Sequence, residues 1–462
     1  MQIKKGQIIE LEIDSLAFGG KGIGRFEGRA VFVEKVLPGD KIKASLTKIK
    51  ESYAEAKLEE FVEKSSERVA AKCRYSGTCG GCAVQELPYP EQLKFKKQQV
   101  IDSFERIGHI KNPPVKDVIG CEQQFYYRNK MEFSFGYDSE MKFTLGMHVP
   151  GRRFDIMDLE ECHLQSVESA EILNRVRDFM IDLGWPPYKV SCNEGFLKAL
   201  FIREGKRTNE IMINLKTSMH VPDDLKKGLE KFVEMLRTID CGDKKITSIY
   251  WSKVNAIRGQ RTTIDEVLLY GSEVLHEEMQ LANGDSLEFE ILPQAFFQVN
   301  TFQAEILYEE VRKLVMETPQ DVVFDLFCGT GTIGLFLAKY VKKIIGIEIN
   351  EDSINAADNN AQKNNVFNVD FYVSDVAKAL EEINERPSTI VIDPPRAGLT
   401  KKGIELIQAF DSKKIVYVSC NPSTLARDCE IFGEYGYKIK NIQPVDMFPH
   451  TYHIENVCLL ER

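Results

Sequence analysis

A cysteine and a carboxylate near the end of the chain are the residues best suited to covalent chemistry. Cys420 follows an apolar run at residues 415–418 and precedes an Asn-Pro pair. Glu455 ends the segment HTYHIE at residues 450–455. A lone cysteine is most often a buried packing residue, but one at the carboxyl end of a strand faces a ligand cleft. A thiol and a carboxylate can together add a nucleophile to an unreactive ring and later remove a proton from it.

A glycine-rich turn predicts a cofactor site. Residues 325–334 read DLFCGTGTIG between an expected strand and an expected helix. Glycines permit a tight turn and let a ligand approach the backbone, although a turn of this kind is a weak signal by itself. Glu348 ends the next expected strand, where a carboxylate can accept hydrogen bonds from both ribose hydroxyls. No arginine stands close by to bind a phosphate.

Four cysteines predict a metal centre. Cys73, Cys79 and Cys82 form the pattern CxxxxxCxxC with glycines between them. Three thiolates this close suit an iron–sulfur cluster or zinc, and Cys162 is the best candidate for the fourth ligand. Both metals accept four thiolates, so the residues themselves leave the choice open. The remaining cysteines are expected to pack in cores.

The elements that must position these residues follow from the pattern of apolar runs. From about residue 286 the expected strands and helices alternate, which predicts a doubly wound parallel α/β sheet with ligands at the strand carboxyl ends. The expected strands are residues 322–325, 343–348, 371–374, 390–393 and 415–418, and the expected helices are residues 333–339 and 352–364.

The first sixty or so residues predict a small five-stranded barrel of the oligonucleotide-binding type. Short apolar-alternating runs are separated by a glycine-rich bend at residues 19–25 and a turn at residues 38–40. Residues 1–57 carry eleven Lys/Arg against eight Asp/Glu in a chain of formal net charge −10. This basic bias favours contact with RNA over a barrel that is only a lid or dimer contact.

Three domains are expected, with boundaries at residues 1–61, 62–285 and 286–462. The middle domain mixes strand and helix patterns, which predicts an α+β unit. Its basic-aromatic segment at residues 125–130 could stack bases or hold phosphates, and a solvated face with a few buried rings explains the segment equally well.

The composition is that of a water-soluble protein, and no apolar run reaches the length of a membrane span. The N-terminus lacks the apolar stretch of a signal peptide. A cytoplasmic protein without a membrane partner is therefore expected. We also expect a monomer.

The motifs around the cysteine and the carboxylate closely resemble those of RNA uracil-C5 methyltransferases. Residues 419–428 read SCNPSTLARD, residues 446–455 read DMFPHTYHIE and residues 294–300 read QAFFQVN. Residues 17–25 with 36–40 resemble the TRAM domain, an RNA-binding barrel. The resemblance covers nearly the whole chain.

The resemblance implies a class I, Rossmann-like methyltransferase fold and S-adenosylmethionine as methyl donor. It implies that Cys420 adds to C6 of uracil and that Glu455 removes the proton from C5. It also implies that a 4Fe–4S cluster binds Cys73, Cys79, Cys82 and Cys162. The substrate that it suggests is 23S ribosomal RNA, with transfer RNA as the alternative. The implied cofactor-binding residues are Gln298, Phe327, Glu348, Asp375 and Asp393.

Asp393 begins the motif Asp-Pro-Pro-Arg. Similar motifs in methyltransferases of base amino groups place an aromatic residue where this chain has Arg396. The difference argues against an amino group as the target and leaves Asp393 to contact the methyl donor and the base.

Two other classes of function remain open. A radical methylthiotransferase also combines a TRAM domain, a cluster and S-adenosylmethionine, but its cluster spacing is CxxxCxxC and its fold is a β/α barrel. A non-catalytic RNA-binding protein that kept the fold is the second alternative.

Overall fold

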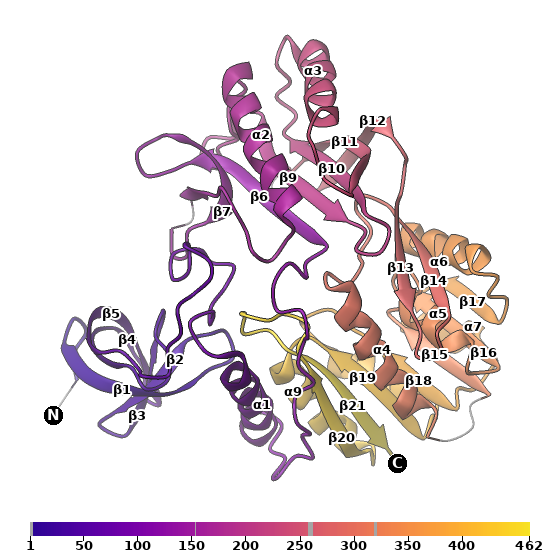
Figure 1. Cartoon of the computed structure of the whole chain (residues 1–462). Helices are drawn as coiled ribbons and strands as arrows, with labels where there is room; N and C mark the ends of the chain where they lie inside the picture. The colour runs from indigo at the N-terminus through magenta and orange to yellow at the C-terminus, as the bar shows by residue number, and fades with distance from the viewer. Residues whose placement is uncertain (1–2, 153, 257–261, 318–320) are drawn as a thin grey trace.

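The computed structural model describes residues 3–152, 154–256, 262–317 and 321–462. In this part of the chain the strands form a closed barrel, two seven-stranded sheets and a two-stranded sheet. Figure 1 shows the barrel on one side, the first large sheet with its helices at the top, and the second large sheet below. Among the described residues, no helix is both long and apolar enough to cross a membrane.

The N-terminal barrel has the strand number that the sequence predicts. Inward-facing Ile9, Leu11 and Ile13 alternate with exposed residues along the first strand and fill the barrel interior. The spatial order is β1-β2-β3-β5-β4. The strands are β1 (Ile8–Leu16), β2 (Gly22–Phe26), β3 (Arg29–Val33), β4 (Lys41–Ile49) and β5 (Tyr53–Glu63).

The glycine-rich segment is only in part the bend that the sequence predicts. Gly19 and Gly20 have positive φ values and form the turn, but Gly22 and Gly24 lie inside β2. A Cβ atom on Gly22 would lie 2.5 Å from the Val36 side chain. These two glycines therefore serve close strand packing rather than chain reversal.

A long helix joins the barrel to the C-terminal sheet. Helix α1 (Tyr89–Arg106) packs on α9, and its Val100 and Phe104 are buried in the core of that sheet. Residues Val115 and Ile119, which follow α1, pair with Ile442 and Val445 of its last-but-one strand. The segment between the barrel and the middle sheet is thus fixed to the C-terminal sheet.

The middle sheet is mixed and covered by helices on one face, as an α+β unit requires. Phe133, Ile202 and Leu215 are fully or almost fully buried under the helices α2 (Val167–Leu183) and α3 (Leu225–Arg237). The strand order is β12-β11-β10-β9-β6-β7-β8. The strands are β6 (Lys130–Tyr137), β7 (Phe143–His148), β8 (Ile156–Asp158), β9 (Leu197–Glu204), β10 (Glu210–Thr217), β11 (Lys245–Asn255) and β12 (Thr263–Gly271).

The predicted domain boundary after residue 285 falls inside a hairpin. Strands β13 (Leu275–Gln280) and β14 (Ser286–Ile291) pair with each other. Leu275 and Met279 share one hydrophobic core with the C-terminal sheet. We therefore propose that the C-terminal unit begins near residue 275 rather than at residue 286.

The C-terminal sheet has the order β17-β16-β15-β18-β19-β21-β20. The first five strands are parallel, but β21 is antiparallel to both of its neighbours, so the prediction of an all-parallel sheet is wrong at this edge. The strands are β15 (Val322–Leu326), β16 (Lys343–Glu348), β17 (Val369–Val373), β18 (Thr389–Ile392), β19 (Lys414–Ser419), β20 (Lys438–Val445) and β21 (Glu455–Glu461). The helices are α4 (Thr301–Val315), α5 (Thr332–Ala338), α6 (Glu351–Lys363), α7 (Val376–Glu382), α8 (Lys401–Ala409) and α9 (Pro422–Glu434).

Candidate active site

The antiparallel edge brings Cys420 and Glu455 together. Ser419, the last residue of β19, pairs with Asn456 of β21, and the Asn456 side-chain amide donates to the Ser419 carbonyl over 3.3 Å. Cys420 is the next residue after Ser419, and Glu455 is the residue before Asn456. The two predicted catalytic residues therefore lie side by side at the end of adjacent strands.

The turn after Cys420 is fixed by Asn421. Its side-chain oxygen accepts from the Ser423 amide over 3.1 Å and caps α9, while its amide donates to the Arg396 carbonyl over 3.1 Å. Pro422 then occupies the first turn of α9, where no amide hydrogen is needed. The Asn-Pro pair thus orients Cys420 and ties it to the segment that follows β18.

Burial and negative charge raise the pKa of both the thiol and the carboxyl group, which favours their neutral forms. Glu455 is 4 % exposed; burial, with the negative charge of Asp393, raises its pKa well above the usual value. Burial and the charges of Glu455 and Asp393 raise the pKa of the Cys420 thiol to about 12, and the positive charge of Arg396 acts against them. The nucleophile therefore needs positive charge, or removal of its proton, before it can react.

A fully buried carboxylate lies at the start of the glycine-rich turn. Asp325 is fully buried, and one of its oxygens accepts from the Gly334 amide over 2.9 Å. The other oxygen, Oδ1, has no hydrogen-bond partner among the described residues. Burial and the nearby negative charge of Asp393 raise the pKa of Asp325 to about 8. Asp325 is not among the cofactor residues that the sequence analysis names, although it begins the glycine-rich segment.

The turn leaves room for a ligand with cationic groups. A Cβ atom on Gly329 would meet nothing within 4 Å, whereas one on Gly331 would lie 2.7 Å from the Phe371 ring. Glu348 stands at this turn, where its oxygens accept from the amides of Gly329 (3.3 Å) and Asn350 (3.0 Å). An open cradle surrounded by carboxylates fits S-adenosylmethionine, which carries an ammonium and a sulfonium group.

The other predicted cofactor residues lie at the ends of the same parallel strands or just before α4. Phe327 follows β15 with a positive φ of 64°, and Asp393 follows β18, where burial raises its pKa to about 7. Gln298 is buried, and its carbonyl accepts from the Asn129 side chain over 2.8 Å. Asp375 caps α7 by accepting from the Lys378 amide over 2.9 Å, so one of its oxygens is already engaged.

The loop of residues 446–454, which leads to Glu455 and is called the catalytic loop below, is held at its start by a buried ion pair. Lys96 of α1 and Asp446 are 2 % and 0 % exposed, and their charged atoms lie 2.6 Å apart. The Tyr89 hydroxyl donates to the second Asp446 oxygen over 2.9 Å. Lys96 also donates to the Phe448 carbonyl over 3.0 Å. The sequence shows these residues, but not that they meet.

The middle of the same loop contacts the segment that carries Cys73, Cys79 and Cys82, which we call the cysteine segment. The amides of Ala83 and Val84, which follow Cys82, donate to the His450 carbonyl over 3.0 and 3.1 Å. His450 also stacks on Phe125 with ring centroids 4.3 Å apart. A change in the cysteine segment can therefore displace the loop that positions Glu455.

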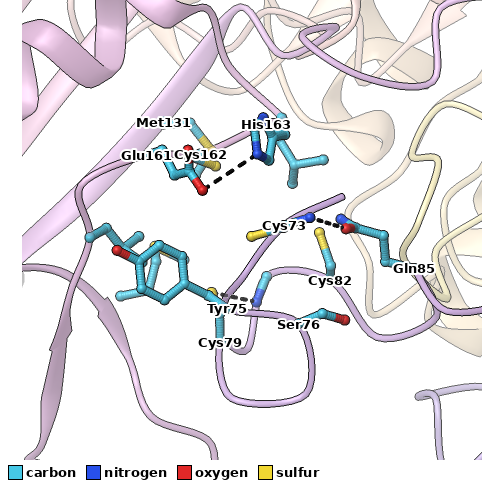
Figure 2. Close-up of a pocket in the computed structure, with 14 residues that line it drawn as sticks. Cys73, Tyr75, Ser76, Cys79, Cys82, Gln85, Met131, Glu161, Cys162 and His163 are labelled. Atoms are coloured by element: carbon cyan, nitrogen blue, oxygen red, sulfur yellow. Dashed lines mark hydrogen bonds and ion pairs between the residues drawn. The ribbon is translucent and has the colours of Figure 1, made fainter. Parts of the chain in front are cut away.

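The four predicted metal ligands line one pocket. Figure 2 shows Cys73, Cys79 and Cys82 on one wall and Cys162 on the opposite wall. Burial, together with the negative charge of the other three cysteines, raises the pKa of Cys82 to about 12. Among the described residues, no three His, Cys, Asp or Glu side chains form a group that could hold a metal ion. The donor set of four converging thiols nonetheless fits the chemistry of a thiolate-bound cluster.

Comparison with known proteins identifies the family. A family model described as tRNA (Uracil-5-)-methyltransferase matches residues 200–462, more than half of the chain. The chain belongs to this family. A second model, the TRAM domain, matches residues 2–58, which include the barrel strands β1 to β4.

Full-length relatives and a solved structure agree with this assignment. An uncharacterized RNA methyltransferase of Clostridium tetani is 36% identical over 464 residues, 100% of this chain and 99% of the relative. One of Chlorobaculum tepidum is 37% identical over 487 residues, with coverage of 100% and 98%. The crystal structure of Pyrococcus abyssi tRNA (uracil-54, C5)-methyltransferase with S-adenosyl-L-homocysteine is 29% identical, with a TM-score of 0.75 over 98% of this chain and 100% of that one. The protein is an RNA uracil-C5 methyltransferase.

Proposed function

We propose that the protein transfers a methyl group from S-adenosylmethionine to C5 of a uridine in RNA through a covalent bond between Cys420 and C6 of the base. The observation that carries this proposal is the pairing of Ser419 with Asn456, which sets the thiol and the Glu455 carboxyl group side by side in a buried site. The complex of the Pyrococcus abyssi enzyme with S-adenosyl-L-homocysteine supports the methyl donor.

The chemistry explains why both groups are needed. Uracil C5 is too poor a nucleophile to take a methyl group directly. When the Cys420 thiolate adds to C6, a carbon–sulfur bond forms and C5 gains the electron pair of an enolate. The donor supplies an electrophilic methyl group, which C5 takes as the donor leaves as a thioether. Glu455 then removes the C5 proton, the bond to C6 breaks, and the thiolate is released.

The residues proposed to hold the methyl donor surround the glycine turn. Glu348 is proposed to accept hydrogen bonds from the ribose hydroxyls, and Phe327 is proposed to line the turn. Gln298 and Asp393 are assigned to the donor on the side of Cys420, and Asp375 to the adenine through its free oxygen. The unpaired oxygen of Asp325 adds a further acceptor that the sequence reading lacked.

The cysteine pocket is proposed to hold a 4Fe–4S cluster through Cys73, Cys79, Cys82 and Cys162. Four thiols converging on one pocket support it, and zinc is the rival ligand. Anaerobic purification followed by metal and sulfide analysis distinguishes the two, because a cluster gives about four iron and four sulfide per chain. Cys162→Ser should lower both counts, whereas Cys192→Ser, at an exposed cysteine, should leave them unchanged.

Two kinds of RNA are candidates for the substrate. The cysteine pattern with a TRAM domain resembles the branch that acts on 23S ribosomal RNA. The Pyrococcus abyssi structure, which matches 98% of this chain, is that of an enzyme acting on transfer RNA. Methyl transfer from tritiated donor to unmodified transcripts of both RNAs assigns the class. The three units are proposed to divide the work, with the barrel and the middle unit binding RNA and the C-terminal unit catalysing.

The decisive experiment uses RNA that contains 5-fluorouridine. Fluorine cannot leave as a proton does, so the adduct with Cys420 should accumulate and survive denaturing electrophoresis. Cys420→Ala should give no adduct, and Cys192→Ala should give as much as the parent. A Cys420→Ala protein that still methylates RNA would overturn the proposed mechanism.

A further inference from the structure

The face of the middle sheet that its helices leave uncovered carries a cluster of cations. Lys130 pairs with Arg203 across β6 and β9. Phe201 and Lys216 belong to the same face, because Phe201 lies two residues from Arg203 on β9, and Lys216 pairs with the next residue of that face, Ala199. We call Lys130, Phe201, Arg203 and Lys216 the cationic platform. Phe133, Leu200 and their neighbours face the opposite side, toward α2 and α3.

The three cations converge on one aromatic ring. The charged groups of Lys130, Arg203 and Lys216 lie 5.9, 5.4 and 5.2 Å from the centroid of the Phe201 ring. The ring is only 5 % exposed, so it is covered by the cations rather than open for stacking. Cation–π attraction lets like charges gather here, and the cluster offers charge, not an aromatic surface, to a partner.

The positive charge of the platform is poorly neutralised. Arg203 is 2 % exposed, and two of its nitrogens, Nε and Nη1, have no hydrogen-bond partner among the described residues. Lys130 forms no ion pair in that part of the chain. Two carboxylates lie on this face: Glu132 pairs with Lys216 over 2.8 Å, and Glu266 accepts from Asn214, the residue beside Phe201 on β10, over 3.5 Å. Burial, with the charges of Arg203 and Lys216, lowers the pKa of Lys130 to about 8. Buried charge without a counter-ion is unfavourable unless an anion binds.

The platform adjoins the active site. The Arg203 guanidinium donates over 2.7 Å to the Ala295 carbonyl in the segment that leads to Gln298. Asn129, which precedes Lys130, donates to the Gln298 carbonyl. The positive charge of Arg128 helps to lower the pKa of both Lys130 and His453, which lies two residues before Glu455. An RNA strand that delivers its base to Cys420 would pass close to these cations.

We propose that Lys130 and Lys216 bind a backbone phosphate of the substrate RNA next to the target uridine, with Arg203 beneath them supplying buried positive charge. The proposal rests on the proposed function for its substrate. A phosphate is the anion that RNA presents at every nucleotide, and it is read without regard to sequence. The platform therefore contributes affinity and strand position rather than choice of base.

The test is the salt dependence of RNA binding by the full-length variant K130Q/K216Q. A fluorescent uridine oligonucleotide is titrated at several salt concentrations. Each lost phosphate contact lowers the slope of log affinity against log salt by about 0.7 for a single strand. We expect a weaker affinity at low salt and a slope reduced by about 0.7, the value for one lost phosphate contact.

Lys198 provides a matched control. It lies on β9 but on the opposite face, is half-buried, and also covers an aromatic ring, that of Tyr188, at 4.2 Å. K198Q should bind RNA as the parent does. A K130Q/K216Q protein with the parent affinity and slope, or an equal loss in K198Q, would overturn the platform. The binding assay needs no methyl transfer, so a parent that binds RNA but methylates neither RNA class would contradict the proposed function and leave the platform standing.

Discussion

At the scale of single residues, the proposed mechanism requires a thiolate at Cys420 in surroundings that oppose it. The negative charges of Glu455 and Asp393 raise the pKa of the Cys420 thiol, and the positive charge of Arg396 lowers it. A buried thiol whose pKa lies near 12 is almost entirely protonated at neutral pH. Cys420 should therefore be unreactive in the free protein and should gain reactivity when the positively charged methyl donor binds among the carboxylates.

Arg396→Gln tests this electrostatic account. Loss of the guanidinium removes the charge that lowers the thiol pKa, so alkylation of Cys420 by iodoacetamide at pH 8 should slow by about two- to fivefold. In the parent the rate should rise about tenfold per pH unit from pH 7 to pH 10 without a plateau, because the pKa lies higher. Peptide mass spectrometry follows the reaction, with exposed Cys192 as internal control. A plateau near pH 8 would contradict the raised pKa.

Glu455→Gln tests the base. The amide cannot accept the C5 proton, so turnover should fall by about 100-fold or more. Addition and methyl transfer do not need the base, and the methylated RNA should stay attached to Cys420. Denaturing electrophoresis with tritiated donor detects the adduct, and the double variant Glu455→Gln/Cys420→Ala should show none. Normal turnover in Glu455→Gln would exclude its role.

At the scale of elements, the catalytic loop is positioned from outside its own sheet. Helix α1 supplies Lys96 to Asp446 at the start of the loop, and the cysteine segment supplies two amides to His450 in its middle. His450 has a positive φ of 68°, which most residues adopt only at a cost. The loop geometry thus depends on contacts with elements that precede it by hundreds of residues in sequence.

Lys96→Met should show that dependence. Removing one partner of a buried ion pair leaves Asp446 uncompensated, which costs about 3 kcal/mol or more and should lower the melting temperature by several degrees. Lys96→Met/Asp446→Asn should recover part of that loss. Lys97→Met, at a neighbouring lysine paired with the exposed Asp117, is the control and should change little. Equal effects at Lys96 and Lys97 would contradict the importance of burial.

At the scale of the whole molecule, the barrel packs against the cysteine segment through a shared hydrophobic core and is not joined to it by the chain alone. Leu16 and Leu37 of the barrel share a small core with Val84 and Leu87 of the cysteine segment. A Cβ atom on Gly20 would lie 3.0 Å from the Tyr452 ring of the catalytic loop. Barrel, cysteine segment and catalytic loop therefore meet at one place, which is visible near the centre of Figure 1. An RNA that contacts the barrel is held close to the loop that carries Glu455.

Acid should weaken the attachment of the barrel to the segment that follows it, because Asp40 of the barrel accepts hydrogen bonds from Ser65 and Arg68 of that segment. Burial alone would raise the pKa of this carboxyl, but hydrogen bonds from Arg68, the Ser65 amide and the Leu37 amide lower it. A lowered pKa in the fold means that Asp40 stabilises the protein above about pH 4 and that this stability is lost as the pH falls further. Asp40→Asn should lower the melting temperature at pH 7.

The difference between Asp40→Asn and the parent should shrink as the pH falls from about 4 toward 2, as thermal unfolding across this range would show. Asp117→Asn removes a carboxylate that is also paired, but exposed, and should have little effect at any pH. A constant difference between Asp40→Asn and the parent across this range would show that the Asp40 charge plays no part.

The sequence by itself determined the alternation of strands and helices, the five-stranded barrel and the family motifs around Cys420 and Glu455, because these follow from short-range periodicity and residue type. It did not determine that β21 runs antiparallel beside β19, which is what sets Glu455 next to Cys420. Strand partners far apart in the chain are chosen by burial and packing, which no local pattern records.

Only the tertiary structure decided what surrounds those two residues. The buried pair Lys96–Asp446, the contact of the cysteine segment with His450 and the unpaired nitrogens of Arg203 each join segments that are distant in sequence or depend on burial. The sequence names the chemical groups of the site. Their protonation, spacing and counter-charges arise from the desolvation and contacts that the fold imposes.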